Sequence, residues 1–189
     1  MGSMLTVKRS AVVLSVIIVA SLALITQNWF IKPEKEQDIA DATLKLPNFE
    51  LKDTDGETFC LSSRRETPVL LHFMTIGCGG QYAEINDYQI RQLLHICDEY
   101  CTENGLDIVT ITVTSCTTSD LKSLKNKYNI TWVIGNDYDD NKLDIIEAYK
   151  EYELYDGTII IGTSGNRFHE IFREKVSSDT LIEKLKEIT

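Results

Sequence analysis

The chain has 189 residues, which is enough for one domain and an additional segment. Its 29 acidic and 19 basic residues give a formal net charge of −10, so its surface repels polyanions and we do not expect nucleic acid as a partner. The five cysteines are an odd number and match no zinc-ligand spacing. At least one thiol must therefore stay unpaired within the chain, and we expect neither a metal site nor a bound cofactor.

The first thirty residues differ from the rest of the chain. Lys8 and Arg9 precede residues 11–31, an uncharged and largely apolar stretch that is long enough to span a bilayer. Basic flanking residues stay in the cytoplasm. The pattern therefore predicts a cytoplasmic segment at residues 1–10, one transmembrane helix at 11–31 that acts as a signal anchor, and an extracytoplasmic remainder on a single-pass protein of the cell membrane. A cleaved signal peptide is the main alternative, although no clear small-x-small cleavage site follows the apolar run.

The next segment is typical of a tether. Residues 32–45 are polar and contain few large apolar side chains. Asn129-Ile130-Thr131 further along is an N-glycosylation sequon, which agrees with a location outside the cytoplasm. We expect residues 46–189 to form one domain.

Turn residues and the period of the apolar positions predict an alternation of strands and helices in this domain. The expected elements, in chain order, are a hairpin with strands at 48–52 and 58–61 around a turn at 53–56, a buried strand at 68–73, a long helix at 81–100, a buried strand at 107–113, a helix at 119–128 capped by Ser119, a short strand at 132–134, a helix at 141–152, a second hairpin at 157–161 and 167–172, and a last helix at 178–188. This order predicts an α/β fold, with a central mixed β-sheet flanked by helices and an N-terminal β-hairpin.

Cys78 is the candidate nucleophile. It lies where the buried strand at 68–73 gives way to the long helix, and two glycines follow it. The free N–H groups and the dipole at a helix N-terminus favour a thiolate over a thiol. A buried structural cysteine is the alternative, because free cysteine is among the most buried residue types.

Four segments carry a resemblance to a known family. They are residues 46–61 (LPNFELKDTDGETFCL), 68–84 (PVLLHFMTIGCGGQYAE), 132–152 and 157–172 (GTIIIGTSGNRFHEIF). In these segments the chain resembles the redoxins, the AhpC/TSA branch of the thioredoxin superfamily, which includes peroxiredoxins and the membrane-anchored TlpA/ResA-type proteins. The resemblance extends over about residues 46–189. It implies a thioredoxin-like fold and, at a redox-active cysteine, thiol–disulfide or peroxide chemistry.

The resemblance assigns roles to single residues. Cys78 matches the attacking cysteine, and Glu84 matches the acidic residue that tunes cysteine acidity in the ResA type. Gln81 stands where the second cysteine of the W-C-x-x-C motif belongs, and Gly77 replaces the tryptophan. Dithiol exchange within that motif is therefore excluded.

Two further comparisons with the family show departures. Asp156, or Gly157 after a shift by one, aligns with the family's cis-proline. Of the peroxiredoxin pattern P-x-x-x-T-x-x-C, Thr75 is kept, whereas Leu71 replaces the proline. Two functions remain open. The first is a thiol oxidoreductase or peroxidase that acts on a protein thiol or disulfide, or on a peroxide. The second is a binding or assembly module that keeps the fold without turnover.

Cys116 is the candidate second thiol. It follows the predicted strand at 107–113, and adjacent parallel strands lie about 4.8 Å apart. If that strand is the neighbour of the one at 68–73, Cys116 and Cys78 lie at the same rim of the sheet, where open α/β sheets place their sites. A thiol from a partner protein is the alternative. We interpret the other cysteines (Cys60, Cys97 and Cys101) and the histidines (His72, His95 and His169) as packing or surface residues.

Overall fold

The protein is described by a computed structural model that covers residues 44–77, 80, 83–101, 105–114, 116–139 and 142–189. All of these residues belong to one compact unit, which comprises residues 40–189. The predicted anchor at 11–31 and nearly all of the tether lie outside this range. Within it, no helix combines the length and the apolar character that a membrane span requires.

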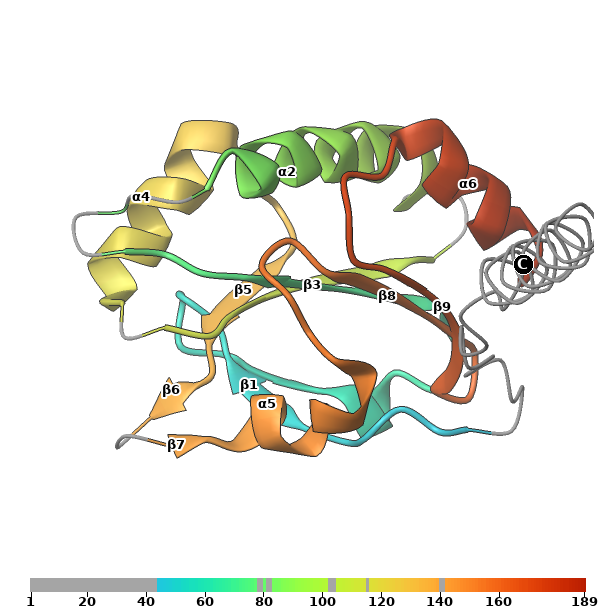
Figure 1. Cartoon of the computed structure of the whole chain (residues 1–189), viewed down its shortest axis with the longest axis horizontal. Coiled ribbons are helices and arrows are strands. Elements are labelled where there is room, and N and C mark those ends of the chain that lie inside the picture. The colour runs from blue at the N-terminus through green and yellow to red at the C-terminus, as the bar shows by residue number, and fades with distance from the viewer. Residues whose placement is uncertain (1–43, 78–79, 81–82, 102–104, 115, 140–141) are drawn as a thin grey trace, which may run out of the picture. The chain divides into compact units, whose positions relative to one another are not determined.

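The described residues form a central five-stranded sheet with the order β5-β4-β3-β8-β9 (Figure 1). Its strands are β3 (Val69–Met74), β4 (Asp107–Thr112), β5 (Val133–Asn136), β8 (Ile159–Thr163) and β9 (Arg167–Phe172). The first three are parallel, whereas β8 runs antiparallel to β3 and β9 antiparallel to β8. The predicted mixed sheet is confirmed, and β3 and β4 are parallel neighbours, which is the condition for Cys116 and Cys78 to lie at the same rim.

Both faces of the sheet are covered, which explains why all six residues of β3 are buried. One face carries α2 (Glu84–Ile96), α4 (Thr118–Tyr128) and α6 (Ser178–Lys186). The opposite face carries the hairpin of β1 (Glu50–Lys52) and β2 (Thr58–Cys60), together with α5 (Asp144–Ala148) (Figure 1). The predicted N-terminal hairpin is thereby confirmed.

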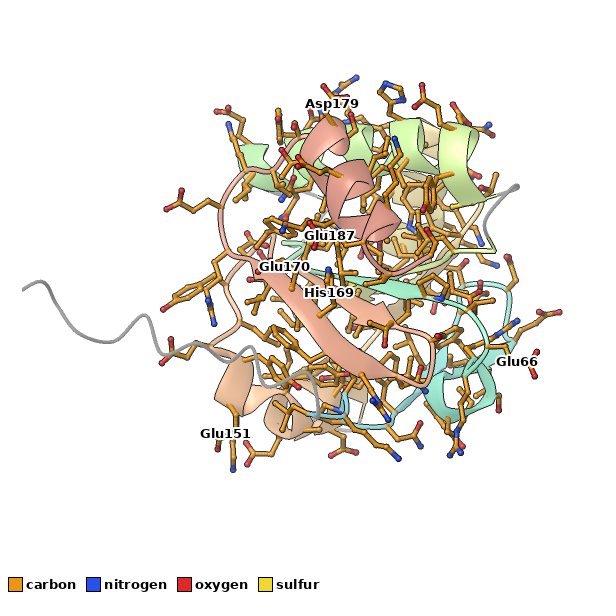
Figure 2. The ribbon with its side chains drawn as sticks, turned by 90° about the vertical axis from the view of Figure 1, so that its right-hand side faces the viewer. Glu66, Glu151, His169, Glu170, Asp179 and Glu187 are labelled. Carbon is orange, nitrogen blue, oxygen red and sulfur yellow. The ribbon has the colours of Figure 1, made fainter. Side chains whose placement is uncertain are left out.

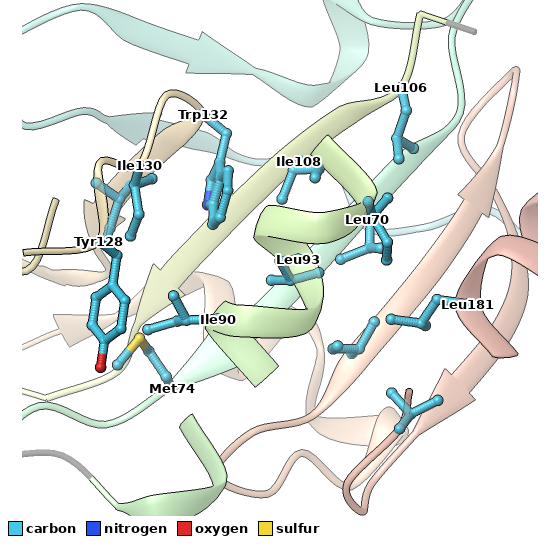
Figure 3. Close-up of a cluster of buried hydrophobic side chains, with 14 of the residues drawn as sticks. Leu70, Met74, Ile90, Leu93, Leu106, Ile108, Tyr128, Ile130, Trp132 and Leu181 are labelled. Atoms are coloured by element: carbon cyan, nitrogen blue, oxygen red, sulfur yellow. The ribbon is translucent and has the colours of Figure 1, made fainter. Parts of the chain in front are cut away.

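The two faces are packed with different side chains. Under the helices the core is mostly aliphatic and includes Leu70, Met74, Ile90, Leu93 and Leu181 (Figure 3). On the hairpin face six aromatic rings form a chain whose neighbouring centroids lie 5.4–6.1 Å apart. These rings belong to Phe49, Phe59, Phe73, Tyr149, Tyr152 and Phe168.

The helix predicted at residues 141–152 is wrong. The chain forms instead a two-stranded ribbon of β6 (Tyr138–Asp139) and β7 (Lys142–Leu143), the short α5, and a 3₁₀ turn, η3 (Lys150–Tyr152). The carboxylate of Asp137 accepts hydrogen bonds from the backbone N–H groups of Ile145 (2.8 Å) and Ile146 (2.9 Å), and so fixes where the helix begins.

Smaller corrections concern helix ends. The cap of α4 is Thr117 rather than Ser119, because Thr117 and Asp120 form a reciprocal capping box. The long helix begins at Glu84 and passes at its end into a π-helical turn, η2 (Cys97–Cys101). A short 3₁₀ helix, η1 (Leu61–Ser63), follows β2.

Candidate functional site

The candidate site lies where the chain leaves the carboxyl end of β3 and enters α2. Cys78 lies outside the described residues, and so does Gln81, the position of the missing second cysteine. Residues on both sides of Cys78 are described, and the N–H of Gly80 donates to the carbonyl of Gly77 at 3.1 Å. The flanking segments are held by specific contacts.

A carboxylate braces the end of β3. Asp156, in the loop before β8, accepts hydrogen bonds from the backbone N–H of Thr75 (2.7 Å) and from the Thr75 hydroxyl (2.8 Å). The side-chain amide of Asn86, in the first turn of α2, donates to Asp156 at 2.8 Å and to the Thr75 carbonyl at 3.4 Å. We call Thr75, Asn86 and Asp156 the Asp156 clamp. It ties together the strand that precedes Cys78 and the helix that follows it.

Gly157 shows how closely the loop approaches these elements. Its φ is 83°, and a Cβ at this position would lie 2.8 Å from the side chain of Ile85. Its N–H donates to the Phe73 carbonyl at 2.9 Å, and its carbonyl accepts from the buried Gln89 amide at 3.2 Å. No peptide bond between described residues is cis. A trans Asp156-Gly157 segment therefore stands where the resemblance aligns a cis-proline.

A second polar side chain holds the next residue of the chain. Thr114, which follows β4, accepts a hydrogen bond from the Ile76 N–H at 2.9 Å and donates its hydroxyl to the Ile76 carbonyl at 2.7 Å. Buried backbone groups need such partners. The clamp and Thr114 thus satisfy the backbone of Thr75 and Ile76 immediately before the chain reaches Cys78.

His72 lies in β3 and is fully buried. Burial lowers its pKa to about 4, so the imidazole is neutral at physiological pH. Its Nδ1 lies 3.4 Å from the hydroxyl of Thr110, which accepts a hydrogen bond from the indole N–H of Trp132 at 3.0 Å. The interpretation of His72 as a core residue is confirmed.

Cys116 follows β4 and is half-buried. Burial raises the pKa of its thiol, and the sulfur lies 3.4 Å from the Thr112 hydroxyl. The side chain borders a cleft of about 520 Å³ that Thr54, Asn136 and Tyr138 also line. Cys116 therefore stands on the predicted rim. Cys78 lies outside the described residues, so the pairing of the two thiols stays a prediction.

Glu84 is the first residue of α2 and its side chain is 88% exposed. Its carboxylate lies 2.6 Å from the ammonium of Lys175, and this contact lowers the pKa of Glu84. The structure thus places Glu84 six positions after Cys78 on the surface, as an exposed ion-paired residue at the helix N-terminus. Its predicted influence on Cys78 remains to be measured.

The other described cysteines have different surroundings. The Ser62 hydroxyl, 3.1 Å from the sulfur, lowers the pKa of Cys60. Cys97 and Cys101 are half-buried and pack against the aliphatic core, and burial raises the pKa of Cys101 to about 12. These two are packing residues, as the sequence predicted.

The sheet order, the preceding hairpin and the covering helices define a thioredoxin-like fold, and the candidate site occupies its strand-to-helix junction. No family model and no curated protein matches the sequence. Solved structures do match. A thiol:disulfide interchange protein of the thioredoxin family from Chlorobium tepidum TLS superposes with a TM-score of 0.64 at 15% identity, over 79% of this chain and 99% of that chain.

Two further structures show the same fold. A thiol-disulfide oxidoreductase from Bacteroides fragilis has a TM-score of 0.60 at 19% identity, over 77% of this chain and 99% of its own. A secreted disulfide oxidoreductase from Mycobacterium tuberculosis has a TM-score of 0.53 at 15% identity, over 74% and 95%. The predicted thioredoxin-like fold is confirmed by these likenesses.

Sequence reasoning missed two contributors to the site. Asn86 is fully buried although it lies in a helix predicted without polar core residues, and Thr114 falls between the strand predicted at 107–113 and the helix predicted at 119–128. The signal for Asn86 was its helical spacing: Asn86, Gln89 and Leu93 share one buried face. For Thr114 the sequence held no comparable signal.

Proposed function

We propose that this chain is a membrane-anchored, extracytoplasmic thioredoxin-fold protein that exchanges disulfides through a single active-site cysteine, Cys78. One observation carries the proposal. The chain segment with Cys78 joins β3 to α2, and the Asp156 clamp together with Thr114 holds its approach by five hydrogen bonds to Thr75 and Ile76. Such bracing suits a reactive group that must be kept in one place.

The proposed reaction begins with the thiolate of Cys78. It attacks one sulfur of a partner's disulfide, a new S–S bond joins Cys78 to the partner, and the other sulfur leaves as a thiolate. A second thiol then attacks the mixed disulfide at Cys78 and releases the partner. Because Gln81 replaces the neighbouring cysteine, this thiol comes from Cys116 or from another molecule. The raised pKa of Cys116 makes it a slow nucleophile and favours an external thiol.

Disulfide exchange is favoured here over peroxide reduction for a structural reason. In the peroxidase alternative, Thr75 would be the conserved hydroxyl near the cysteine. That hydroxyl already donates a hydrogen bond to the carboxylate of Asp156 at 2.8 Å. It is therefore engaged in the clamp rather than available to a peroxide.

Alkylation kinetics of the full chain test this proposal. Because the pKa of Cys60 is lowered, a Cys60→Ser background removes a competing thiol. Between pH 5 and pH 9, peptide mapping should show that Cys78 reacts faster than Cys97 and Cys101 at neutral pH. Labelling of Cys78 only after unfolding would identify it as a core residue and reject the proposal.

Turnover is tested with a peptide that carries a mixed disulfide. Cys78→Ser should abolish thiol release, whereas Cys60→Ser should leave it unchanged. The wild-type chain should accumulate a Cys78–peptide disulfide until glutathione is added. If this mixed disulfide instead converts into a Cys78–Cys116 disulfide, and does not do so in Cys116→Ser, Cys116 is the second thiol.

A binding or assembly module is the second candidate. The trans Asp156-Gly157 segment favours it, since the position aligned with the family's cis-proline carries neither that residue nor that isomer. In this case Cys78→Ser would retain partner binding in full, and the wild-type chain would show no thiol release.

The membrane topology belongs to the same proposal and is supported by the sequence alone. In vesicles of known sidedness, protease added to the outer side should remove residues 46–189. Protection from that protease would reject the extracytoplasmic orientation, and loss of the N-terminal residues in the mature protein would identify a cleaved signal peptide.

A further inference from the structure

A second cleft lies at the turn between β8 and β9, lined by residues that the proposed exchange does not use. Its volume is about 280 Å³. Three of its lining residues are cationic, namely Lys45, Arg65 and Arg167, and the lining contains no acidic side chain. We call it the basic cleft. The chain as a whole has a net charge of −10, so the positive charge of this cleft is opposite in sign to that of the whole chain.

Two of these cations face one another. Lys45 forms an isolated antiparallel bridge with Arg167, the first residue of β9. Residues directly opposite in an antiparallel pair point to the same side of the sheet, and like charges placed so repel each other. The backbone of the third residue, Arg65, is held at the same turn, because its carbonyl accepts a hydrogen bond from the N–H of Gly165 at 2.6 Å.

The repulsion is not compensated by the protein. Among the described residues, no carboxylate lies within 4.0 Å of the charged groups of Lys45, Arg65 or Arg167, the distance that defines an ion pair. Lys125 on α4, by contrast, has such a partner, since it contacts Asp55 at 3.0 Å. The three cations of the basic cleft therefore have no carboxylate partner among the described residues, and an anion bound in the cleft would neutralise them.

A buried amide holds the wall of the basic cleft. Asn166 lines the cleft, is only 7% exposed and donates through its Nδ2 to the Leu61 carbonyl at 2.8 Å. Its backbone carbonyl accepts a hydrogen bond from the N–H of Leu46 at 2.8 Å. The turn before Arg167 is therefore tied to the segment that carries Lys45, which keeps these two cations close together.

We propose that the basic cleft binds a phosphate dianion, either free hydrogen phosphate or the headgroup of a lipid. Lys45, Arg65 and Arg167 neutralise the charge, with the guanidinium groups donating paired hydrogen bonds to phosphate oxygens.

The test uses the full chain in detergent solution, titrated with inorganic phosphate and followed by calorimetry and thermal unfolding. Saturable binding that Arg167→Gln or Lys45→Gln weakens at least tenfold is the expected result. The matched control is Lys122→Gln, which removes the same charge from an exposed position on α4 outside the cleft, and it should bind as the wild type does. Absence of saturable binding, or equal affinity in all four proteins, overturns the proposal.

A further arm refines the identity of the ligand. Short-chain phosphatidic acid that binds at least tenfold tighter than inorganic phosphate identifies a lipid headgroup, whereas equal affinity identifies the free ion.

Stability without ligand gives an independent readout that does not depend on finding the right anion. In phosphate-free buffer, Arg167→Gln relieves the repulsion with Lys45 and should raise the midpoint of thermal unfolding. Phosphate should raise the midpoint of the wild type and leave that of Arg167→Gln unchanged. A lower midpoint for Arg167→Gln without phosphate would show that Arg167 has a structural partner, and would contradict the proposal.

Discussion

The two faces of the central sheet differ in what fills them. The hairpin face is filled by aromatic rings in mutual contact, whereas fully buried polar side chains lie among the aliphatic ones of the helix face: His72, Asn86, Gln89 and Thr110 are each 0% exposed. Buried polar groups are costly unless they are paired, and they then fix geometry. The comparison indicates that the aromatic face supplies stability, whereas Asn86 and Gln89 of the helix face hold Thr75 and Gly157 beside the candidate site.

The largest expected effect breaks the aromatic face. Phe73→Ala removes a ring that is 1% exposed from the middle of the aromatic chain, and it should lower the free energy of unfolding by about 3–5 kcal/mol. In the molecules that remain folded, the pH dependence of Cys78 alkylation should not change. Urea unfolding and peptide mapping measure the two properties. A shift in that pH dependence would show that the aromatic face also tunes the site.

The next effect is a pH dependence that belongs to the helix face. The pKa of His72 is about 4 in the folded protein, below its ordinary value of 6.5, so the unfolded chain binds the proton more strongly. Stability is therefore fully present above pH 6.5 and is lost as the pH falls towards 4. The loss at pH 4 should reach about 3 kcal/mol, at about 1.4 kcal/mol per pH unit.

His72→Leu isolates this contribution from that of the carboxyl groups. Urea unfolding at pH 7 and pH 4 should show a decrease in the wild type that exceeds the decrease in the variant by about 3 kcal/mol. Equal decreases in the two proteins would mean that His72 takes up its proton as readily when folded as when unfolded.

A smaller change in stability is expected from the Asp156 clamp, together with a change in reactivity. Asp156→Ala removes the hydrogen bonds from Thr75 and Asn86 and should lower the free energy of unfolding by about 2–3 kcal/mol. The rate of Cys78 alkylation should change as well. Asp156→Asn is the matched control, because it keeps the shape and one acceptor while it removes the charge. If both variants label Cys78 as the wild type does, the clamp has only a structural role.

The smallest effect is expected from Glu84→Gln. Glu84 is exposed, so the unfolding midpoint should not change measurably. Removal of its negative charge should move the alkylation profile of Cys78 to slightly lower pH, and removal of the neighbouring positive charge by Lys175→Gln should move it the other way. Identical profiles in the two variants would exclude Glu84 from the tuning of Cys78.

Much of the fold was predictable because its signals are local. The Asp53–Gly56 turn predicts the first hairpin, and the apolar runs at 68–73 and 107–113 predict two buried strands. In the structure these two strands lie side by side. The helix predicted at 141–152 failed although its apolar spacing is helical. Asp137, a residue outside that pattern, caps the chain at Ile145 and so shortens the helix.

The site was predictable only in part. Its centre, Cys78, follows from a strand that ends where a helix begins, which is visible in one stretch of sequence. The clamp is not visible in this way. Thr75 and Asp156 are 81 positions apart and Asn86 and Asp156 are 70 apart, so no local pattern relates them. In the sequence Asp156 stands out only as a departure from the family's cis-proline. Its hydrogen bonds with Thr75 and Asn86 depend on the tertiary structure.

The two outer strands of the sheet have a consequence for how copies of this protein meet. An uncovered edge strand invites another chain to add to the sheet. At β5 the hairpin closes the edge: Asp53 bridges Gly135, and a Cβ on Gly135 would lie 2.5 Å from the Lys52 carbonyl, so only glycine admits this cover.

At β9 the first residues are covered by residues 44–46. Further along, the strand carries the carboxylate of Glu170, and His169 lies 3.4 Å from Glu187 beyond the end of α6 (Figure 2). Both edges are thus protected against strand addition. If the proposed membrane anchor concentrates copies of the chain, neighbouring copies should still resist joining their sheets into aggregates.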